Sequence, residues 1–140
     1  MRLLVTGSRQ WINQAQLYDE LDHARDGWVA EQLQATAEPD LDGFIVVHGG
    51  APGADTLAGQ WTHDRRTLSQ PPVQEVHPAN WKMGPIAGNV RNHEMVILGA
   101  DLVIGFLVPS AANRGTRHCL AEAKTWLGFK GVPIKEIWEE

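Results

Sequence analysis

The sequence has 140 residues, 43% of them hydrophobic, and a formal net charge of −5 at pH 7. This length suits one compact core, so we interpret residues 1–140 as a single domain. The acidic balance lacks the positive field that attracts duplex nucleic acid, and every apolar run is shorter than the roughly 20 residues that cross a bilayer. The one cysteine, Cys119, excludes an internal disulfide. We therefore expect a cytoplasmic protein with no membrane role and no duplex nucleic-acid partner.

The first half of the chain alternates apolar, strand-like runs with segments of helical periodicity. The pattern predicts a strand over 2–6, a helix over 14–33, a loop over 36–42, a strand over 43–48 and a helix over 54–68. The run over 43–48 is apolar without alternation, which is typical of a parallel strand buried on both faces. Asn13 suits the N-cap of the first helix, whereas Gly27 weakens that helix and is the position where it would split.

The second half continues the alternation. It predicts a strand over 73–77, a helix over 84–99, a strand over 101–108, a polar loop over 109–115, a helix over 116–127 and a strand over 132–137. Parallel strands need crossover connections, and these are right-handed. We expect an α/β fold, namely a Rossmann-like domain whose parallel sheet of about five strands has the order 3-2-1-4-5 and carries helices on both faces.

Three glycine-rich loops join predicted strands to predicted helices, at 7–9, 49–55 and 113–116. In an open α/β sheet such loops share the carboxyl edge, where ligands bind. Glycine lets backbone N–H groups approach a phosphate, and the helix that follows adds its dipole. The alternative is that each glycine only permits a tight turn. Because three such loops occur together, we favour an anion site.

The motifs exclude two common nucleotide-binding classes. The chain lacks both the Gly-x-Gly-x-x-Gly of dinucleotide dehydrogenases and the Gly-Lys-Ser/Thr of a P-loop. Arg9, Arg91 and Arg114 are the cations best placed for this edge, since guanidinium groups bind phosphate in a bidentate manner. Each could instead be a solvated surface arginine. If Arg91 faces a wet pocket, it makes few packing contacts and its removal changes stability little.

The order of several motifs along nearly the whole chain is specific. The segments are Val5–Arg9 with Trp11, His48–Asp55, Pro78–Trp81, Arg91–Met95, Gly99–Val103 and Arg114–His118. They resemble the YspA-like, cpYpsA-related family of the SLOG superfamily, which is related to the DprA and LOG proteins. The resemblance implies a Rossmann-like fold and a site for nucleotides or related phosphate compounds. The ligand-binding residues it implies are Thr6, Gly7, Ser8, Arg9, Gly49, Gly50, Ala51, Gly53, Asp55, Arg91, Asn92, Arg114, Gly115 and Thr116.

The chain departs from the motif of the LOG-type phosphoribohydrolases, Pro-Gly-Gly-x-Gly-Thr-x-x-Glu. If Gly115 and Thr116 are its Gly-Thr, Cys119 stands where the catalytic glutamate would be. Glu122 follows one helical turn later, about 4.5 Å further along the axis. No catalytic residue is therefore assigned, and Asp55 and Glu122 are the candidates for an acid or base.

Asp55 has a structural and a functional interpretation. At the start of a helix, a carboxylate caps free N–H groups and is favoured by the dipole. Alternatively, Asp55 accepts hydrogen bonds from a ribose or holds Mg²⁺ beside phosphates. We expect Cys119 to be a core thiol. The histidines lack zinc-ligand spacing, so no metal centre built on them is expected, although His48 and His77 end predicted strands and are placed to line a pocket.

Four tryptophans carry functional expectations. Trp11 and Trp81 lie in loops near the predicted site, where either could stack on a base. Trp61 and Trp126 lie in predicted helices, and we expect them at the interface of a symmetric homodimer.

Three functions fit these observations. We favour binding or sensing of a nucleotide or nucleotide-derived phosphate ligand at the carboxyl edge of the sheet. The second is a nucleotide-processing enzyme that acts at an N-glycosidic bond or a phosphate, with Arg91 as electrostatic stabiliser. The third is a carrier of a molybdopterin-type cofactor, whose phosphate the same loops would hold. No cofactor is required by these observations, although Mg²⁺ could accompany a nucleotide ligand.

Overall fold

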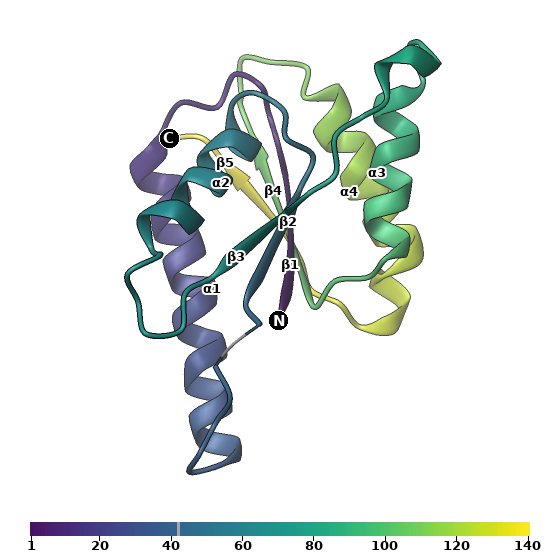
Figure 1. The fold of residues 1–140 in the computed structure, drawn as a ribbon. Coiled ribbons are helices and arrows are strands. Elements are labelled where there is room, and N and C mark those ends of the chain that lie inside the picture. Colours follow the sequence, from purple (N-terminus) through teal and green to yellow (C-terminus); the bar gives the residue numbers. More distant parts are fainter. Residues whose placement is uncertain (42) are drawn as a thin grey trace.

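A five-stranded sheet lies between two layers of helices in the computed structural model, which describes residues 1–41 and 43–140 (Figure 1). Helices α1 and α2 cover one face, and α3 and α4 cover the other. The elements are β1 (Arg2–Gly7), α1 (Gln14–Ala35), β2 (Ile45–His48), α2 (Ala54–Asp64), β3 (Val73–Val76), the 3₁₀ turn η1 (Trp81–Met83), α3 (Ala87–Ile97), β4 (Leu102–Leu107), α4 (Arg114–Trp126), the 3₁₀ turn η2 (Gly128–Lys130) and β5 (Ile134–Trp138). The predicted α/β, Rossmann-like fold is confirmed.

All neighbouring strands of the sheet are parallel, and their order is β3-β2-β1-β4-β5. This confirms the predicted order 3-2-1-4-5. Leu4 in β1 pairs with Val47 in β2 and with Val103 in β4, which makes β1 the central strand. Because the strands are parallel, the three glycine-rich loops leave the sheet at the same edge. The chain turns toward one face after β1 and toward the other after β4, so the loops part between these two strands.

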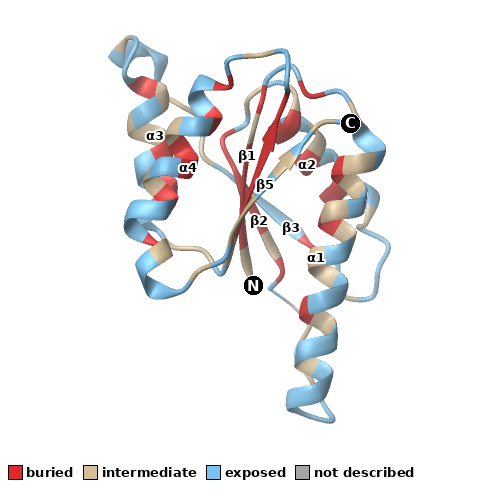
Figure 2. Ribbon diagram, turned by 180° about the vertical axis from the view of Figure 1, so that it is seen from behind, coloured by how far each residue is buried: buried red, intermediate tan, exposed pale blue. Residues whose placement is uncertain are grey.

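The core consists of two apolar clusters, one on each face of the sheet (Figure 2). Successive side chains of a strand point to opposite faces, so Leu3 and Val5 join the cluster under α1 and α2, whereas Leu4 joins the one under α3 and α4. This explains why the central strands are apolar without alternation. Edge strand β3 differs, since Val73 and Val76 are 52% and 44% exposed.

Several element boundaries differ from the prediction. Helix α1 passes through Gly27 without a break, because that position lies on the surface with nothing near it. Helix α3 is shorter than the expected 84–99, since Gly84 and Gly99 both adopt positive φ and end the helical geometry. Of the loop expected over 36–42, residue 42 lies outside the described residues. No helix in the described part of the chain is long and apolar enough to cross a membrane.

Two predictions for tryptophan are wrong. Trp11 is 1% exposed and packs edge-on against Phe106, with 5.1 Å between ring centroids, so it cannot stack on a base. Trp61 is fully buried against Phe44 and donates its indole N–H to Asp22, so it cannot form a dimer interface. Both rings fill the core under α1 and α2. Large aromatic side chains bury much apolar area, and tertiary packing uses that area here.

Candidate functional site

A cavity of about 350 Å³ opens at the carboxyl edge of the sheet, where the loops after β1 and β4 part. Its volume lies within the range of small-molecule sites, about 300–1,000 Å³. It is lined by Thr6, Gly7, Ser8, Arg9, Gln10, Ala51, Asp55, Trp81, Gly88, Asn89, Arg91, Asn92, Met95, Ala111, Ala112, Asn113, Arg114, Gly115 and Thr116. The structure thus brings together residues from β1, α2, α3 and α4 that the sequence predicted as one site.

Three of the predicted residues, Gly49, Gly50 and Gly53, do not line this cavity. The guanidinium of Arg91 covers Gly49 and would collide with a Cβ there. A Cβ on Gly53 would collide with the carbonyl oxygen of Ser8, so this glycine allows the start of α2 to lie against the loop after β1. Gly50 has φ +72° and faces β3. In the structure these glycines have packing and turn roles, and their predicted part in ligand binding stays a prediction.

The first turn of α4 opens directly into the cavity. The residue before it, Asn113, adopts the left-handed conformation with φ 55°. Its side-chain oxygen accepts from the N–H of Val108 at 3.0 Å, and its amide nitrogen donates to the carbonyls of Val108 and Ala111, both at 2.9 Å. Asn113 therefore fastens the loop and leaves α4 without a side-chain cap. Gly115 and Thr116 of this first turn line the cavity. The first turn of a helix has N–H groups without partners inside the helix and carries the positive end of the helix dipole.

Arg91 fixes the opposite wall. Its Nη1 donates to the carbonyl of Gly49 at 2.8 Å and to that of His77 at 3.3 Å, and its Nε donates to Asn92 Oδ1 at 3.0 Å. Asn92 in turn donates to the carbonyl of Gly115 at 3.2 Å. These bonds tie α3 to the loops after β2 and β3 and to α4. The expectation that Arg91 makes few structural contacts is therefore wrong, although its guanidinium also lines the cavity.

Among the described residues that line the cavity, Asp55 is the only one with a carboxylate side chain. Its side chain does not cap α2. Instead Oδ2 accepts from the N–H groups of Gly49 and Ala51, each at 3.2 Å, and thereby organises the loop after β2. The residue is 5% exposed, and Oδ1 has no hydrogen-bond partner within the described chain. Burial raises the pKa of Asp55, against the opposing effect of nearby His48.

Trp81 and Arg9 form the rim of the cavity. Trp81 begins η1 and is 57% exposed, and the guanidinium carbon of Arg9 lies 5.8 Å from the centroid of its ring. The sequence predicted both residues near the site. Gly88 and Asn89 of α3 also line the cavity but were not among the predicted site residues. Their spacing was an available signal, because Gly88 precedes Arg91 by three residues and Asn92 by four and so shares their helix face.

Cys119, at the position of the LOG glutamate, and Glu122, one helical turn later, do not line the cavity. Cys119 is fully buried, and burial raises the pKa of its thiol to about 11. Glu122 does not line the cavity, and its carboxylate contacts His93 Nδ1 at 2.9 Å and His118 Nε2 at 3.7 Å. Of the two candidates for an acid or base, Asp55 and Glu122, Asp55 lines the cavity and Glu122 does not.

The two histidines that end predicted strands contact other residues. His48 is 3% exposed, its Nδ1 accepts from the N–H of Gly50 and its Nε2 contacts Gln74, while His77 contacts Glu75. Neither lines the cavity. Across residues 1–41 and 43–140, no group of three or more His, Cys, Asp or Glu side chains has an arrangement that could hold a metal ion.

Comparison with known proteins agrees with the motifs. The family model described as YspA, cpYpsA-related SLOG family matches residues 1–84. A relative named Gene 61 protein, from Mycobacterium phage D29, is 37% identical over 134 residues, which cover 95% of this chain and 93% of the relative. No solved structure matches the chain significantly.

Proposed function

The chain belongs to the YspA, cpYpsA-related SLOG family, and from this premise we propose that it binds a nucleotide or a nucleotide-derived phosphate compound in the cavity at the carboxyl edge of the sheet. The observation that carries the proposal is the uncapped first turn of α4, which opens into that cavity. Unpaired N–H groups and a positive helix end are a standard site for phosphate.

The phosphate lies at α4 in this proposal. Arg114 is the first residue of the helix, lines the cavity and has an exposed side chain without a hydrogen bond or ion pair in the described structure. Its charge therefore stays available for a ligand. A guanidinium beside free N–H groups supplies charge-assisted hydrogen bonds to a phosphate, and these are stronger than neutral ones.

Trp81 is the platform for the base. Its exposed indole lines the cavity and is already in cation–π distance of Arg9. An aromatic face that accepts a guanidinium also accepts a flat nucleobase, and such stacking contributes about 1–3 kcal/mol per base. A pterin ring with a phosphate would use the same two ends of the cavity, so ligand identity separates a nucleotide from a molybdopterin-type compound.

Binding without turnover fits the cavity better than hydrolysis. Glu122 is turned away from it, and Asp55 is held by two backbone N–H groups of its own loop. We place sensing or carriage of the ligand ahead of a reaction on it.

Titration calorimetry with AMP, GMP, CMP and UMP tests the proposal, together with native mass spectrometry of the protein purified from its own host to find retained molecules. We expect at least one nucleotide to bind, and Arg114→Gln to weaken its binding about tenfold, because one charge-assisted hydrogen bond is lost. Arg117→Gln is the matched control. It removes the same charge from the same helix but does not line the cavity. Equal affinities of wild type and Arg114→Gln would place the phosphate elsewhere.

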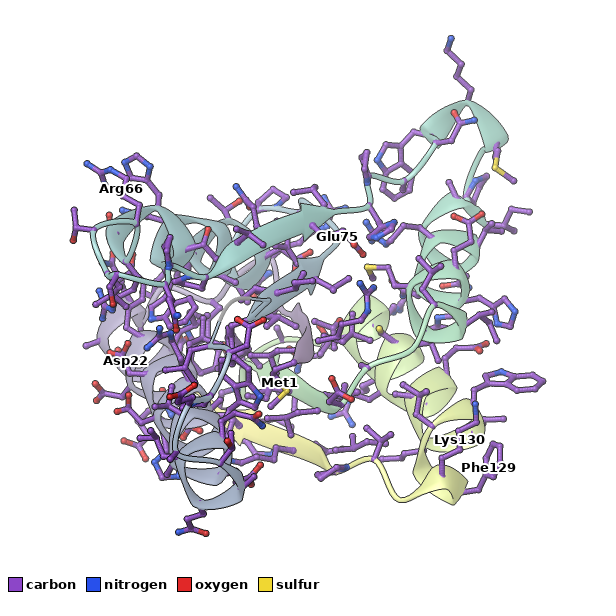
Figure 3. All side chains as sticks on the ribbon, turned by 60° about the horizontal axis from the view of Figure 1, so that its bottom comes forward. Met1, Asp22, Arg66, Glu75, Phe129 and Lys130 are labelled. Atoms are coloured by element: carbon purple, nitrogen blue, oxygen red, sulfur yellow. The ribbon has the colours of Figure 1, made fainter. Side chains whose placement is uncertain are left out.

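A homodimer is part of this proposal. Trp126 on α4 is 44% exposed and contacts His93 on α3, with 5.8 Å between their ring centroids. Ile97, one turn beyond His93, and Phe129 on η2 (Figure 3) are 54% and 74% exposed. These side chains give the outer face of α3 and α4 an apolar character that suits a symmetric contact.

A further inference from the structure

We infer that Asp55 accepts a hydrogen bond from a sugar hydroxyl of the ligand, so that the cavity distinguishes ribose from a deoxy sugar that lacks that hydroxyl. The inference rests on the proposed function and assigns the third part of the ligand, between the phosphate at α4 and the base at Trp81.

The unpartnered oxygen of Asp55 is the starting observation. Oδ2 is occupied by the N–H groups of Gly49 and Ala51, whereas Oδ1 is buried and has no partner within the described residues. A buried acceptor without a donor costs about 1–3 kcal/mol, and most such atoms in native proteins are paired. Asp55 is among the residues that line the cavity, and in this inference a bound molecule supplies the missing donor.

The surroundings of Oδ1 favour a neutral donor over an anion or a metal ion. A phosphate beside this carboxylate would be repelled, which keeps the anionic end of the ligand at α4. Mg²⁺ needs six oxygen ligands in octahedral geometry, usually with more than one hard anionic donor. Asp55 is the one carboxylate among the described residues of the cavity wall, and Oδ2 is already bound to two N–H groups. A hydroxyl group requires only Oδ1.

The proposed contacts of the phosphate, the base and the sugar differ in how far they are buried. Arg114 and Trp81 are exposed and belong to α4 and η1, whereas Asp55 is 5% exposed and belongs to α2, which packs on the opposite face of the sheet from α4. In a nucleotide the sugar lies between phosphate and base. The two exposed groups therefore take the ends of the ligand, and the buried acceptor takes the sugar in the middle.

Calorimetric titration with nucleoside monophosphates that differ only in the sugar tests the proposed hydrogen bond to Asp55. The nucleoside monophosphate that binds wild type most tightly is compared with its 2′-deoxy and 3′-deoxy forms. We expect one of the deoxy forms to bind about tenfold to hundredfold more weakly, because the charge-assisted hydrogen bond to Oδ1 is lost. In Asp55→Asn, whose amide keeps one oxygen for the loop N–H groups, this ratio falls at least several-fold. Arg114→Gln is the control and weakens both sugars equally.

Each outcome decides between the proposals. If no monophosphate binds and native mass spectrometry finds no retained phosphate compound, the proposed function fails, and this inference fails with it. If nucleotides bind but wild type treats ribose and both deoxyriboses alike, only the inference is overturned, and this comparison needs no variant that must fold. A ratio that persists in well-folded Asp55→Asn also overturns it. Binding that requires Mg²⁺ and is abolished by EDTA, with no preference between the sugars, would assign Oδ1 to the metal ion instead.

Discussion

Arg91 combines a structural and a functional position in one side chain. Its guanidinium holds the carbonyls of Gly49 and His77 and also forms part of the cavity wall. These bonds fix the side chain in place before a ligand arrives, so little conformational entropy is lost when an anion contacts it. The same bonds make Arg91 a poor position for separating binding from stability.

Arg91→Ala should lower the free energy of unfolding by about 1–3 kcal/mol, because two backbone carbonyls lose a charged donor. Chemical denaturation measures this. Arg114→Ala is the control, since Arg114 makes no hydrogen bond within the described chain and its loss should change stability by no more than about 0.5 kcal/mol. An unchanged denaturation midpoint in Arg91→Ala would show that these bonds contribute nothing net.

Cys119 and Glu122 predict the absence of phosphoribohydrolase activity. The thiol at the position of the catalytic glutamate is buried, and Glu122 contacts His93 outside the cavity. Incubation with AMP, GMP or CMP should release no free base above a buffer control, measured by chromatography. Base release that disappears in Glu122→Gln would assign the chain to the enzymes instead.

At the scale of elements, the contact between α2 and the loop after β1 depends on Gly53. This residue has φ 80° and ψ −124°, a conformation that side chains other than glycine rarely adopt, and a Cβ would meet the backbone of Ser8 and Arg9. The N–H of Ala54 donates to the carbonyl of Ser8 at 3.1 Å in the same contact. The junction therefore aligns two loops of the cavity.

Gly53→Ala should cost about 2–4 kcal/mol of stability, from backbone strain and the collision together. Gly115→Ala is the matched control, because nothing lies within 4 Å of its Cβ position, and thermal unfolding should be unchanged or slightly higher. The two glycines look alike in the sequence. Similar losses in both variants would contradict this distinction.

Edge strand β3 carries Glu75, which is labelled in Figure 3. Its carboxylate ties β3 to Arg2 of β1. Arg2 of β1 donates to both carboxylate oxygens of Glu75, at 3.1 and 2.8 Å, and His77 contacts one of them at 2.8 Å. The hydrogen bonds from Arg2 and then His77 hold the pKa of Glu75 down at about 2, below its ordinary value of 4.5.

A lowered pKa predicts a pH-dependent contribution. The carboxylate stabilises the fold above pH 4.5, and this contribution is lost as the pH falls through 4.5 toward about 2. The free energy of unfolding of wild type should therefore exceed that of Glu75→Gln by about 1 kcal/mol at pH 7. The effect is no larger because the Glu75 side chain is 37% exposed, and the difference should shrink in acid. Urea denaturation across pH measures it. Glu136→Gln, which removes a more exposed pair with Lys124, is the control. A difference that grows in acid would contradict the assignment.

At the scale of the whole molecule, the two layers of helices have different surfaces. The face of α1 and α2 buries Trp61, and the outer face of α3 and α4 exposes Trp126. The cavity lies at the carboxyl edge of the sheet, away from the exposed Phe129 on η2. A contact through Trp126 and Phe129 would leave the cavity open to a ligand.

Sedimentation velocity at micromolar concentration should show a species of twice the 15.5 kDa chain mass. Trp126→Glu should shift it to the monomer, because a charge in an apolar interface is not solvated. Leu33→Glu on α1, which changes an exposed residue on the other layer, is the control and should remain dimeric. A wild-type monomer at high micromolar concentration would exclude self-association through this face.

The order of strands and helices was predictable from the sequence alone. Short apolar runs that alternate with helical segments are typical of parallel strands buried on both faces, and the strand order was then predicted from right-handed crossovers and the doubly wound fold class. Motif order likewise identified Thr6, Asp55 and Asn92 as members of one site, and these residues line one cavity.

Which of these residues line the cavity and which hold its loops in place could be seen only in the folded chain. Gly53 and Gly115 both lie in glycine-rich loops between a strand and a helix. A Cβ on Gly53 would collide with the backbone of Ser8, whereas a Cβ on Gly115 would have nothing within 4 Å. Likewise Trp11 and Trp81 both lie in polar loops, but one is buried against Phe106. The reason is physical: exposure, hydrogen-bond partners and the orphaned oxygen of Asp55 depend on contacts between segments far apart in the chain, which local periodicity does not encode.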